Sequence, residues 1–304
     1  MRCHLVKISI IIVSYNSEED IENCLFSLIK EVKNIPNEIF VVDNNSRDKT
    51  VQILQEKFPD VNLIVNDFNA GFPGANNQAI ARAQGELIFL LNPDTIVCPS
   101  SVHTLMAAMD IDQCIGACGP RLVDGFGRVA PDIRRPTVLG VIGSVLWGTR
   151  FQRQHLPTDQ VEILSGAALL TRRSVLDVVG LLDERMFWRE DVDFCFRALK
   201  AGYLNRVVPE STIVHLVGRS ASSNIELALE KPISSSIFYF MKHHGRSAAF
   251  LVMLFLWWQT VLRFVKWAVI GIVRPSTEAQ RRFDALKKIM LRFPGYLRTA
   301  RNTL

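Results

Sequence analysis

Three carboxylates stand within four residues of this 304-residue chain, at Glu190, Asp191 and Asp193. Acidic residues at the start of a helix complement its dipole, which explains part of such a cluster. Three carboxylates together repel one another unless a cation, an arginine or a proton offsets the repulsion. Phe187 and Trp188 precede them, and a carboxylate beside aromatic rings can act as a general base. The cluster is therefore a candidate site of proton transfer.

Asp94 and His215 are candidates for holding a metal ion. Asp94 ends the segment Asn92-Pro93-Asp94 after an apolar run, where one carboxylate can bind Mg²⁺ or Mn²⁺, although the same residues also make a good turn. His215 follows another apolar run and is either a structural histidine or a further ligand. The first predicted strand is followed by Ser14-Tyr15-Asn16-Ser17, without the glycines that cradle a diphosphate, and a carboxylate-bound cation is the usual substitute.

The elements that must position these residues alternate along the first half of the chain. The β-branched run Ile8 to Val13 predicts a strand buried on both faces, and Ser17 is a candidate cap for the helix that follows it. Further strands are expected over 38–42, 61–65 and 87–91, and helices over 51–58 and 74–83. This alternation predicts a doubly wound α/β sheet, which binds ligands beyond the carboxyl ends of its strands.

The pattern loosens after residue 110. Strands are expected over 116–123, 162–171 and 205–208, and helices over 174–179 and 191–201. Residues 128–160 are polar and Arg-rich without a clear period, and they are interpreted as a functional insertion or lid. The six cysteines are scattered through apolar stretches, which is typical of buried thiols in a reducing compartment.

The net charge of +5 is distributed unevenly. Residues 242–304 hold 12 Lys or Arg against Glu278 and Asp284, so this tail carries +10 and the preceding residues −5. A basic tail on an acidic body favours an anionic partner. The first apolar run is shorter than the core of a secretory signal, which predicts a location on the cytoplasmic side.

The tail is also strongly apolar. Residues 248–273 hold few polar side chains, and Gln259, Arg263 and Lys266 fall on one helical face. A spanning helix would place such charges in lipid at about 2.5–3.5 kcal/mol each, whereas an interfacial helix avoids this cost. A buried core helix would leave the basic excess unexplained. We therefore predict peripheral attachment to an anionic membrane surface, at the cytoplasmic face of the plasma membrane, and no nucleic-acid partner.

Six motifs between residues 5 and 225 resemble, in order, those of family 2 inverting glycosyltransferases. The similarity is greatest to the rhamnosyltransferase-like branch, which builds bacterial cell-surface polysaccharides. The motifs are Val13-Ser14-Tyr15-Asn16, Val42-Asp43-Asn44-Asn45-Ser46, Asn69-Ala70-Gly71-Phe72 with Ala75-Asn76-Asn77, Leu91-Asn92-Pro93-Asp94, Ser165-Gly166-Ala167 and Glu190-Asp191-Val192-Asp193. The resemblance implies a GT-A fold, an α/β doubly wound mixed sheet, and a nucleotide-diphosphate sugar as donor.

The resemblance also implies a role for each matching residue. The nucleotide and the donor sugar would be bound by Ser14, Tyr15, Asn16, Asp43, Ser46, Asn69, Gly71, Phe72, Asn76 and Asn92. Asp94, with His215 as second ligand, would bind Mg²⁺ or Mn²⁺ on the diphosphate. Asp191 would be the catalytic base, with Glu190 beside it at the acceptor, and Arg197 would pair with Asp193. Arg134, Arg135 and Trp188 would contact a phosphate or the acceptor.

Two departures from the family pattern qualify these roles. The metal motif of many GT-A enzymes begins with an aspartate where this chain has Asn92, which implies weaker metal binding. Trp188-Arg189 stands where an aromatic and a less charged residue are common, which implies a different sugar or acceptor.

The sequence thus predicts a metal-dependent hexosyltransferase-type enzyme. It would move a sugar, with rhamnose a candidate, to a hydroxyl of a lipid-linked saccharide in cell-surface polysaccharide synthesis. Residues 1–225 would form the catalytic domain and residues 226–304 a helical membrane-associated region, with self-association left open. Two rivals stand beside this prediction: an enzyme that makes nucleotide sugars, and a non-catalytic nucleotide-sugar-binding scaffold of a polysaccharide assembly complex.

Overall fold

The computed structural model describes residues 6–130, 136–147, 160–216 and 225–303. The chain forms two compact units. The α/β unit comprises Met1–Arg135, His155–Glu184 and Glu190–Ser220, and the helical unit comprises Pro136–Gln154, Arg185–Arg189 and Ala221–Leu304. Within the helical unit, residues 138–147 contact the long helix that begins at residue 225, and Phe187 is bonded to Ser235 of that helix.

The α/β unit is built on one nine-stranded mixed sheet of order β3-β2-β1-β4-β8-β6-β9-β5, with β7 beside β9. The strands are β1 (Ile8–Ser14), β2 (Asn37–Asp43), β3 (Asn62–Val65), β4 (Leu87–Leu91), β5 (Thr95–Val97), β6 (Ile115–Val123), β7 (Gln160–Val161), β8 (Ala168–Arg172) and β9 (Leu204–His215). β1 to β4 are mutually parallel, β8 runs against β4 and β6, and β6 and β9 are parallel. The carboxyl ends of β1, β2, β4, β6 and β9 therefore share one edge with the amino ends of β5 and β8, because β5 runs against β9.

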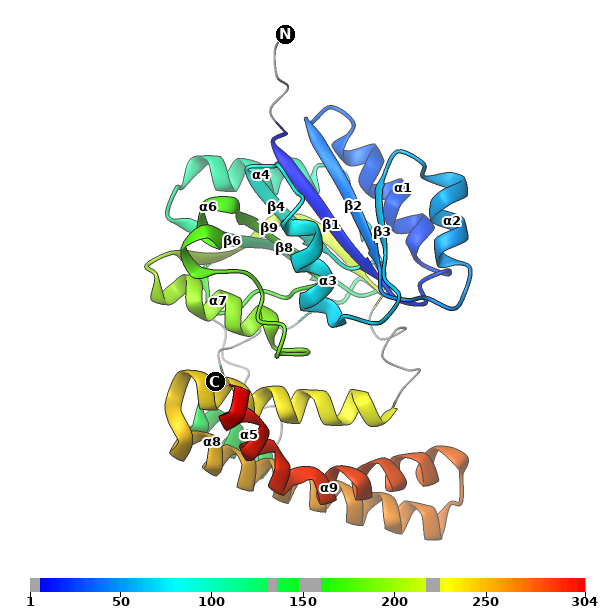
Figure 1. The fold of residues 1–304 in the computed structure, drawn as a ribbon, viewed down its shortest axis with the longest axis vertical. Helices are drawn as coiled ribbons and strands as arrows, with labels where there is room; N and C mark the ends of the chain where they lie inside the picture. Colours follow the sequence, from blue (N-terminus) through cyan, green and yellow to red (C-terminus); the bar gives the residue numbers. More distant parts are fainter. Residues whose placement is uncertain (1–5, 131–135, 148–159, 217–224, 304) are drawn as a thin grey trace. The chain divides into compact units, whose positions relative to one another are not determined.

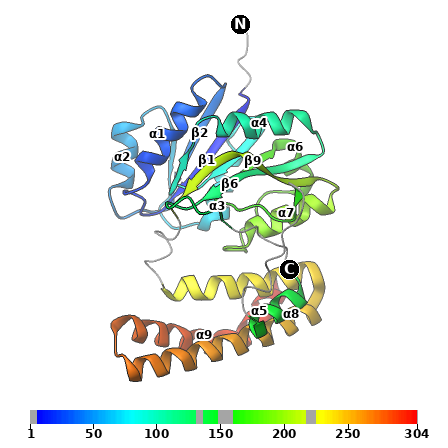
Figure 2. The same ribbon diagram turned by 180° about the vertical axis from the view of Figure 1, so that it is seen from behind.

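Helices cover both faces of this sheet, as doubly wound folds require. They are α1 (Ile21–Val32), α2 (Thr50–Lys57), α3 (Gly71–Ile80), α4 (Ser101–Ile111), α6 (Arg173–Val179) and α7 (Glu190–Lys200). Leu25 of α1, Leu54 of α2 and Leu105 of α4 share one buried core with the strands. Figure 1 shows α3, α6 and α7 in front of the sheet, and Figure 2 shows α4 on the opposite face. All seven residues of β1 are buried, as its β-branched run predicts.

The predicted strands and helices of the first half are confirmed apart from details at their ends. The first helix begins at Ile21, and Ser17 is not its cap, because residues 17–20 form a turn in which the Ser17 hydroxyl accepts from the Tyr15 N–H. The strand expected over 162–171 is confined to β8, and that expected over 205–208 extends to His215. The stretch 128–160, which shows no clear period and is interpreted as a functional insertion or lid, contains α5 (Val138–Trp147).

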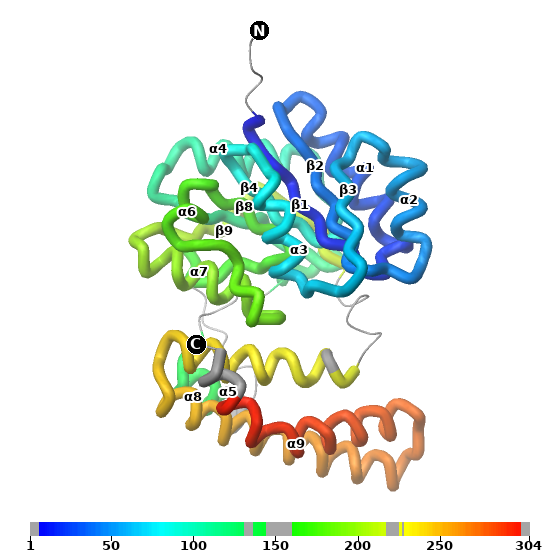
Figure 3. Tube along the Cα trace, in the orientation of Figure 1, coloured from blue at the N-terminus to red at the C-terminus, as the bar shows by residue number. Residues whose placement is uncertain are grey.

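The helical unit consists of α5, α8 (Ile225–Val273) and α9 (Thr277–Thr303). Gly245 interrupts α8 with φ 83°, a backbone conformation that glycine adopts readily, so α8 has two helical halves, 225–244 and 246–273. Ile233 and Ile237 of the first half pack with Ile289 and Phe293 of α9. Figure 3 traces the chain back along itself after the break at Gly245 and again between α8 and α9.

Candidate active site

The turns that follow β1 and β2 are joined by a buried carboxylate. Asp43 is fully buried, and its Oδ2 accepts from the hydroxyls of Ser14 at 3.1 Å and Ser46 at 2.5 Å. The Ser46 N–H donates to Asp43 Oδ1 at 2.9 Å, and the Asn16 N–H donates to Ser46 Oγ at 2.8 Å. Asn16 itself has φ 51°, which asparagine tolerates better than most residues. Four residues predicted to bind the donor thus form one rigid pair of turns, with the Tyr15 side chain 37% exposed beside them.

Asn44 links the β2 turn to α3, a role that the sequence analysis did not assign. Its Nδ2 donates to the Gly71 carbonyl at 3.1 Å, and its Oδ1 accepts from Asn66 Nδ2 at 3.0 Å and from the Ala70 N–H at 3.2 Å. Asn69 Oδ1 accepts from the Gly71 N–H at 2.9 Å. Asn69 and Gly71, both predicted to bind the sugar donor, therefore belong to the same hydrogen-bond network. The position of Asn44, directly after a buried strand and beside Asp43, is the sequence feature that could have indicated this role.

The neighbouring residues Asn76 and Asn77 of α3 make different hydrogen bonds. Asn76 is buried, and its Nδ2 donates to the Phe72 carbonyl at 2.9 Å. This bond joins two residues that are predicted to bind the sugar donor. Asn76 Oδ1 has no hydrogen-bond partner within the described residues. Asn77 donates to the Leu182 carbonyl and to Glu184, and it accepts from the Leu182 N–H. Asn77, which received no role from the sequence, therefore anchors the segment that leads towards α7.

Asp94 and His215 are brought together by the pairing of β5 with β9. Thr95 lies opposite His215 in that antiparallel pair, and the Leu216 N–H donates to the Asp94 carbonyl at 2.9 Å. As a result Asp94 Oδ1 and His215 Nε2 are 3.3 Å apart, with Asn92 Nδ2 3.5 Å from the same ring nitrogen. The expected proximity of these three residues is thus present, although 121 positions separate Asp94 from His215 in the sequence.

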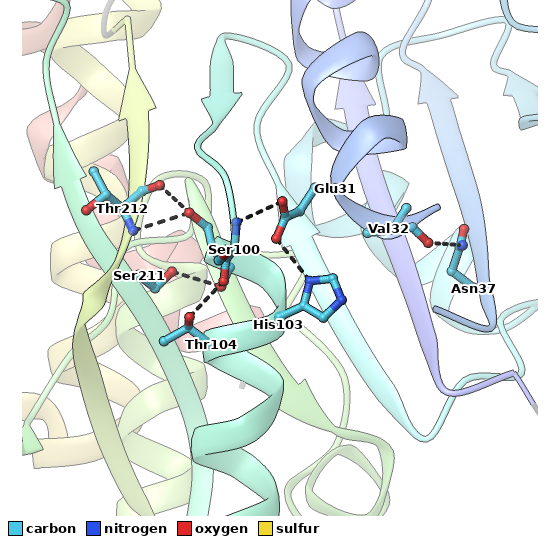
Figure 4. Close-up of polar contacts among 9 residues, drawn as sticks. Glu31, Val32, Asn37, Ser100, His103, Thr104, Ser211 and Thr212 are labelled. Atoms are coloured by element: carbon cyan, nitrogen blue, oxygen red, sulfur yellow. Dashed lines mark hydrogen bonds and ion pairs between the residues drawn. The ribbon is translucent and has the colours of Figure 1, made fainter. Parts of the chain in front are cut away.

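A network at the other end of β5 holds β9 in register (Figure 4). The Ser101 hydroxyl donates to the Thr212 carbonyl at 2.6 Å, and the Ser211 hydroxyl donates to the Ser101 carbonyl at 3.1 Å. Glu31 of α1 accepts from the Ser100 N–H at 2.9 Å and lies 3.2 Å from His103 Nδ1. Thr212 lies three residues before His215 on the same strand. These bonds therefore oppose a shift in the register of β9, which would move the imidazole away from Asp94.

Asp94 and His215 provide two side-chain donors for a cation. Among the described residues, no group of three or more His, Cys, Asp or Glu side chains is arranged to hold a metal ion. A pair is sufficient for a cation that also binds substrate, since Mg²⁺ is commonly held by one or two carboxylates together with phosphate oxygens and water. Carboxylate oxygen also suits Mn²⁺. The donor set therefore fits a cation shared with a diphosphate better than a closed structural metal site.

Asp191 lies in the first turn of α7 and is tied to the loop before β8. The Gly166 N–H donates to Asp191 Oδ2 at 3.0 Å, and a Cβ on Gly166 would lie 3.4 Å from the Cβ of Asp191. The next residue, Ala167, accepts from the Asn92 N–H at 2.9 Å. A short run of backbone contacts therefore connects the carboxylate expected to act as base to the end of β4, close to Asp94.

Asp193 has a structural role, as the sequence predicted. Its side chain is fully buried, and Arg197 Nε donates to its Oδ2 at 2.7 Å. The same guanidinium donates to the carbonyls of Val179, Gly180 and Leu181 after α6. Of the three clustered carboxylates, Asp193 is neutralised by this ion pair, Glu190 is buried and Asp191 is half-buried.

Replacing Arg197 with methionine is expected to lower the free energy of unfolding by about 3 kcal/mol, because it leaves the buried Asp193 carboxylate without its counter-charge. Denaturant titration monitored by circular dichroism measures the change. A double variant, Arg197→Met with Asp193→Asn, should recover part of the loss, since it removes the unpaired charge. Equal instability of the single and double variants would contradict this explanation.

Three of the cysteines are buried thiols. Burial raises the pKa of the Cys24, Cys118 and Cys195 thiols to about 12, so they stay protonated near neutral pH. Cys114 is exposed, which corrects the expectation that the thiols are all buried, because it lies in the loop between α4 and β6. Cys3 lies outside the described residues.

Of the other predicted site residues, the structure describes Trp188 and Phe72. Trp188 belongs to the helical unit, is 40% exposed and has φ 71°, an unusual value for a bulky residue. Arg134 and Arg135 lie outside the described residues. Phe72 is half-buried at the beginning of α3.

Comparison with known proteins gives concordant results. The family model described as glycosyl transferase family 2 matches residues 9–180. The N-acetylglucosaminyl-diphospho-decaprenol L-rhamnosyltransferase of Mycobacterium tuberculosis is 30% identical over 310 residues, a match that covers 90% of this chain and 95% of that protein. The mannosyltransferase PcManGT from Pyrobaculum calidifontis, solved with GDP-Man and Mn²⁺, is similar with a TM-score of 0.57 at 16% identity over 97% of this chain and 85% of its own. Staphylococcus aureus TarS 1–349 with UDP-GlcNAc gives 0.54 at 20% identity over 97% and 87%.

The mixed sheet and these structural likenesses define a GT-A glycosyltransferase fold. The chain belongs to glycosyl transferase family 2, and its similarity to the mycobacterial enzyme extends over nearly its whole length. The predicted fold class, family and glycosyltransferase activity are therefore confirmed.

Proposed function

We propose that this enzyme transfers a sugar, with inversion, from a nucleotide-diphosphate sugar to a hydroxyl of a lipid-linked saccharide. The observation that carries the proposal is the match to an enzyme named for rhamnose transfer to N-acetylglucosaminyl-diphospho-decaprenol. Because at most a tenth of this chain lies outside that match, it must extend into the C-terminal helices. Rhamnose is accordingly the first sugar to test, and a lipid diphosphate saccharide the first acceptor.

The proposed reaction is a single displacement. Asp191 accepts the proton of an acceptor hydroxyl, whose oxygen attacks the anomeric carbon on the face opposite the nucleotide, and the nucleotide diphosphate leaves. The Gly166 N–H donates to Asp191 Oδ2 at 3.0 Å and the Val192 N–H donates to Oδ1 at 2.7 Å, so backbone groups on two sides hold the carboxylate in place. Buried Glu190 lies next to it in the first turn of α7, at the proposed acceptor side.

The donor would be bound at the turns after β1, β2 and β4. The buried Asp43 carboxylate fixes Ser14, Asn16 and Ser46, and this rigidity would lower the entropy cost of placing the base and ribose. Asp94 and His215 would hold Mg²⁺ or Mn²⁺ against the diphosphate. When bound, such a cation neutralises the charge that develops on the leaving group.

Incubation of the purified protein with nucleotide-diphosphate sugars and a polyprenyl-diphosphate N-acetylglucosamine acceptor tests the proposal. We expect one donor, first of all dTDP-rhamnose, to give a glycosylated lipid detectable by mass spectrometry. Donor binding without product under every metal and acceptor condition would favour the rival function of a non-catalytic scaffold.

We further propose that the helical unit binds a membrane surface without crossing it. Ala228–Val273 is long and apolar enough to span a bilayer by length and composition. However, the polar helix α9 packs along it: Phe264 stacks on Phe283 with ring centroids 4.6 Å apart, and the Arg282 guanidinium lies 4.9 Å from the Trp267 ring. A span in this conformation would carry the charges of α9 into hydrocarbon, which is strongly unfavourable.

An interfacial position suits the exposed side chains of α8 better. Phe250, Leu254, Trp258, Leu262 and Val265 are each between 43% and 52% exposed and recur at helical spacing. Tryptophan favours the headgroup region, and nearby basic residues favour anionic lipid. Lys288 and Arg292 of α9 are instead paired with Glu226 and Glu230 of α8, so they stabilise the helical unit itself.

The protein is expected to sediment with vesicles containing anionic phospholipid and to bind purely zwitterionic vesicles more weakly. Raising salt from 0.1 to 0.5 M should weaken binding several-fold, because screening shortens the reach of the basic residues. The double variant Trp258→Ser with Leu262→Ser should reduce binding, whereas Ile111→Ser, an exposed apolar residue on α4, serves as the matched control. Resistance to alkaline carbonate extraction would instead indicate a span.

A further inference from the structure

The two proposed metal ligands meet through a very short strand pairing within the α/β unit. Asp94 directly precedes β5, and His215 ends β9, which runs antiparallel to β5 over only three residue pairs. So short a pairing supplies few ladder hydrogen bonds. The 3.3 Å separation of Asp94 Oδ1 and His215 Nε2 therefore depends on further contacts that hold β5 and the turn before it.

Thr95 is the residue that joins the two sides of this pair. Its backbone lies opposite His215 in the register of β5 and β9, and its Oγ1 donates to the Asn92 carbonyl at 2.7 Å. A threonine hydroxyl that bonds the carbonyl three residues earlier is a common local turn contact. Thr95 is 1% exposed, so the bond that closes the turn carrying Asp94 is shielded from water.

The Asn92 carbonyl is well suited to hold this turn. Because Pro93 has no N–H, that carbonyl is the one hydrogen-bonding group of the peptide between Asn92 and Pro93. The preceding N–H of Asn92 donates to the Ala167 carbonyl at 2.9 Å. Asn92 is thus held through both of its backbone groups, while its Nδ2 lies 3.5 Å from His215 Nε2.

A buried thiol of α1 supports the Thr95 contact. Cys24 Sγ lies 3.5 Å from the Asn92 carbonyl oxygen and 3.5 Å from Thr95 Oγ1. Cys24 is fully buried, and its protonated thiol is a weak hydrogen-bond donor. The Thr95 hydroxyl is therefore enclosed by α1 on the side away from β9.

Helix α1 holds the rest of β5 without using the Thr95 hydroxyl. The Val97 N–H donates to Ser27 Oγ at 3.0 Å, and the Ser100 N–H donates to Glu31 Oε2 at 2.9 Å. Loss of the Thr95 hydroxyl should therefore loosen the turn at 92–94 and leave the far end of β5 in place.

We propose that Thr95 is a positioning residue that sets Asp94 against His215 for cation binding. Its hydroxyl fixes the turn that carries Asp94, and its backbone pairs with the strand position of His215. This inference rests on the proposed function, in which Asp94 and His215 hold the cation on the diphosphate.

Thr95→Val is the decisive variant, because valine keeps the shape of threonine and removes the hydroxyl, and Thr95→Ser is the conservative rescue. Thr171→Val is the matched control: Thr171 is also 1% exposed, and its Oγ1 donates to the Gly116 carbonyl at 2.8 Å, between β8 and β6. Both valine variants remove one buried hydroxyl from one carbonyl, so they should lower the thermal unfolding temperature to a similar extent.

Mn²⁺ titration of the full chain with a nucleoside diphosphate, followed by electron paramagnetic resonance, separates the variants. The Kd for Mn²⁺ should rise about ten-fold or more in Thr95→Val, because residues that orient metal ligands affect affinity by about 10–100-fold. Thr95→Ser should stay within about three-fold of wild type, and Thr171→Val should bind as wild type does. Wild-type affinity in Thr95→Val, or an equal loss in Thr171→Val, would overturn the proposal.

Hydrogen exchange provides a readout that needs no metal. The Leu216 N–H donates to the Asp94 carbonyl at 2.9 Å, so it reports the position of the turn from the β9 side. Peptides covering 90–97 and 210–216 should exchange about ten-fold faster in Thr95→Val and at wild-type rates in Thr171→Val. If wild type itself binds no Mn²⁺, the proposed metal role fails, and the exchange result alone decides whether Thr95 holds Asp94 beside His215.

Discussion

Replacing Asp191 with asparagine is expected to reduce sugar transfer by about 10³-fold while donor affinity stays within about two-fold of wild type. Asparagine preserves the size of the side chain but cannot accept the acceptor proton, and general base catalysis contributes about 10²–10⁴-fold. Its carbonyl oxygen can still accept from the Gly166 N–H, so the start of α7 should keep its position. Initial-rate kinetics with the lipid acceptor, combined with calorimetric titration of the donor, measure the two quantities separately.

Asp177→Asn is the matched control for this variant. Asp177 is an exposed carboxylate on α6, outside the proposed site, and its loss should leave transfer unchanged. Glu190→Gln should have a smaller effect than Asp191→Asn, because Glu190 is proposed to support the acceptor without accepting its proton. Wild-type activity in Asp191→Asn would assign the base to another residue.

Loss of the proposed metal ligands has the second large effect that we expect. Asp94→Asn should lower transfer by at least about 10²-fold, because charge on the departing diphosphate loses a stabilisation worth several kcal/mol. His215→Gln should weaken transfer less, since a neutral amide oxygen replaces one ligand while Asp94 remains. In wild type, a chelator should abolish transfer, and Mg²⁺ or Mn²⁺ added in excess should restore it.

Direct metal binding separates this explanation from a loss of structure. Electron paramagnetic resonance of Mn²⁺ in the presence of the nucleoside diphosphate should show bound metal in wild type and in the Asp177→Asn control, and weak binding in Asp94→Asn. Thermal unfolding should be similar for all three proteins. Transfer that persists in the presence of a chelator would show that the Asp94–His215 pair serves another purpose.

Local patterns in the sequence were sufficient to predict the sheet and most of its ligand-binding edge. Apart from Ser9, the run Ile8 to Val13 consists of β-branched apolar residues, and this composition predicts burial on both faces. Ser14, Asp43 and Asn92 follow such runs directly. Their gathering at one edge follows from the parallel order of β1, β2 and β4, which alternation with helices implies.

Several features of the helical unit could not be predicted from local sequence patterns. The apolar period of residues 248–273 predicts a helix that binds a surface of low polarity. It does not predict the break at Gly245 or the packing of Phe264 against Phe283. α5 was missed inside a stretch of 128–160 that is polar on average. The attachment of α5 to α8, and of Phe187 to Ser235, depends on contacts between residues that are far apart in the sequence.

Hydrophobic period and short motifs act over a few residues, so the fold class, the family and the residue types available for chemistry can be predicted from the sequence. The tertiary structure sets how those residues combine. It places Asp94 beside His215 through the pairing of β5 with β9, and it forms the ion pair between Asp193 and Arg197. It also attached the segment before Asp191 to Ser235 of α8. The physical reason is that strand register and the burial of single hydrogen bonds are set by distant parts of the chain, which no local pattern encodes.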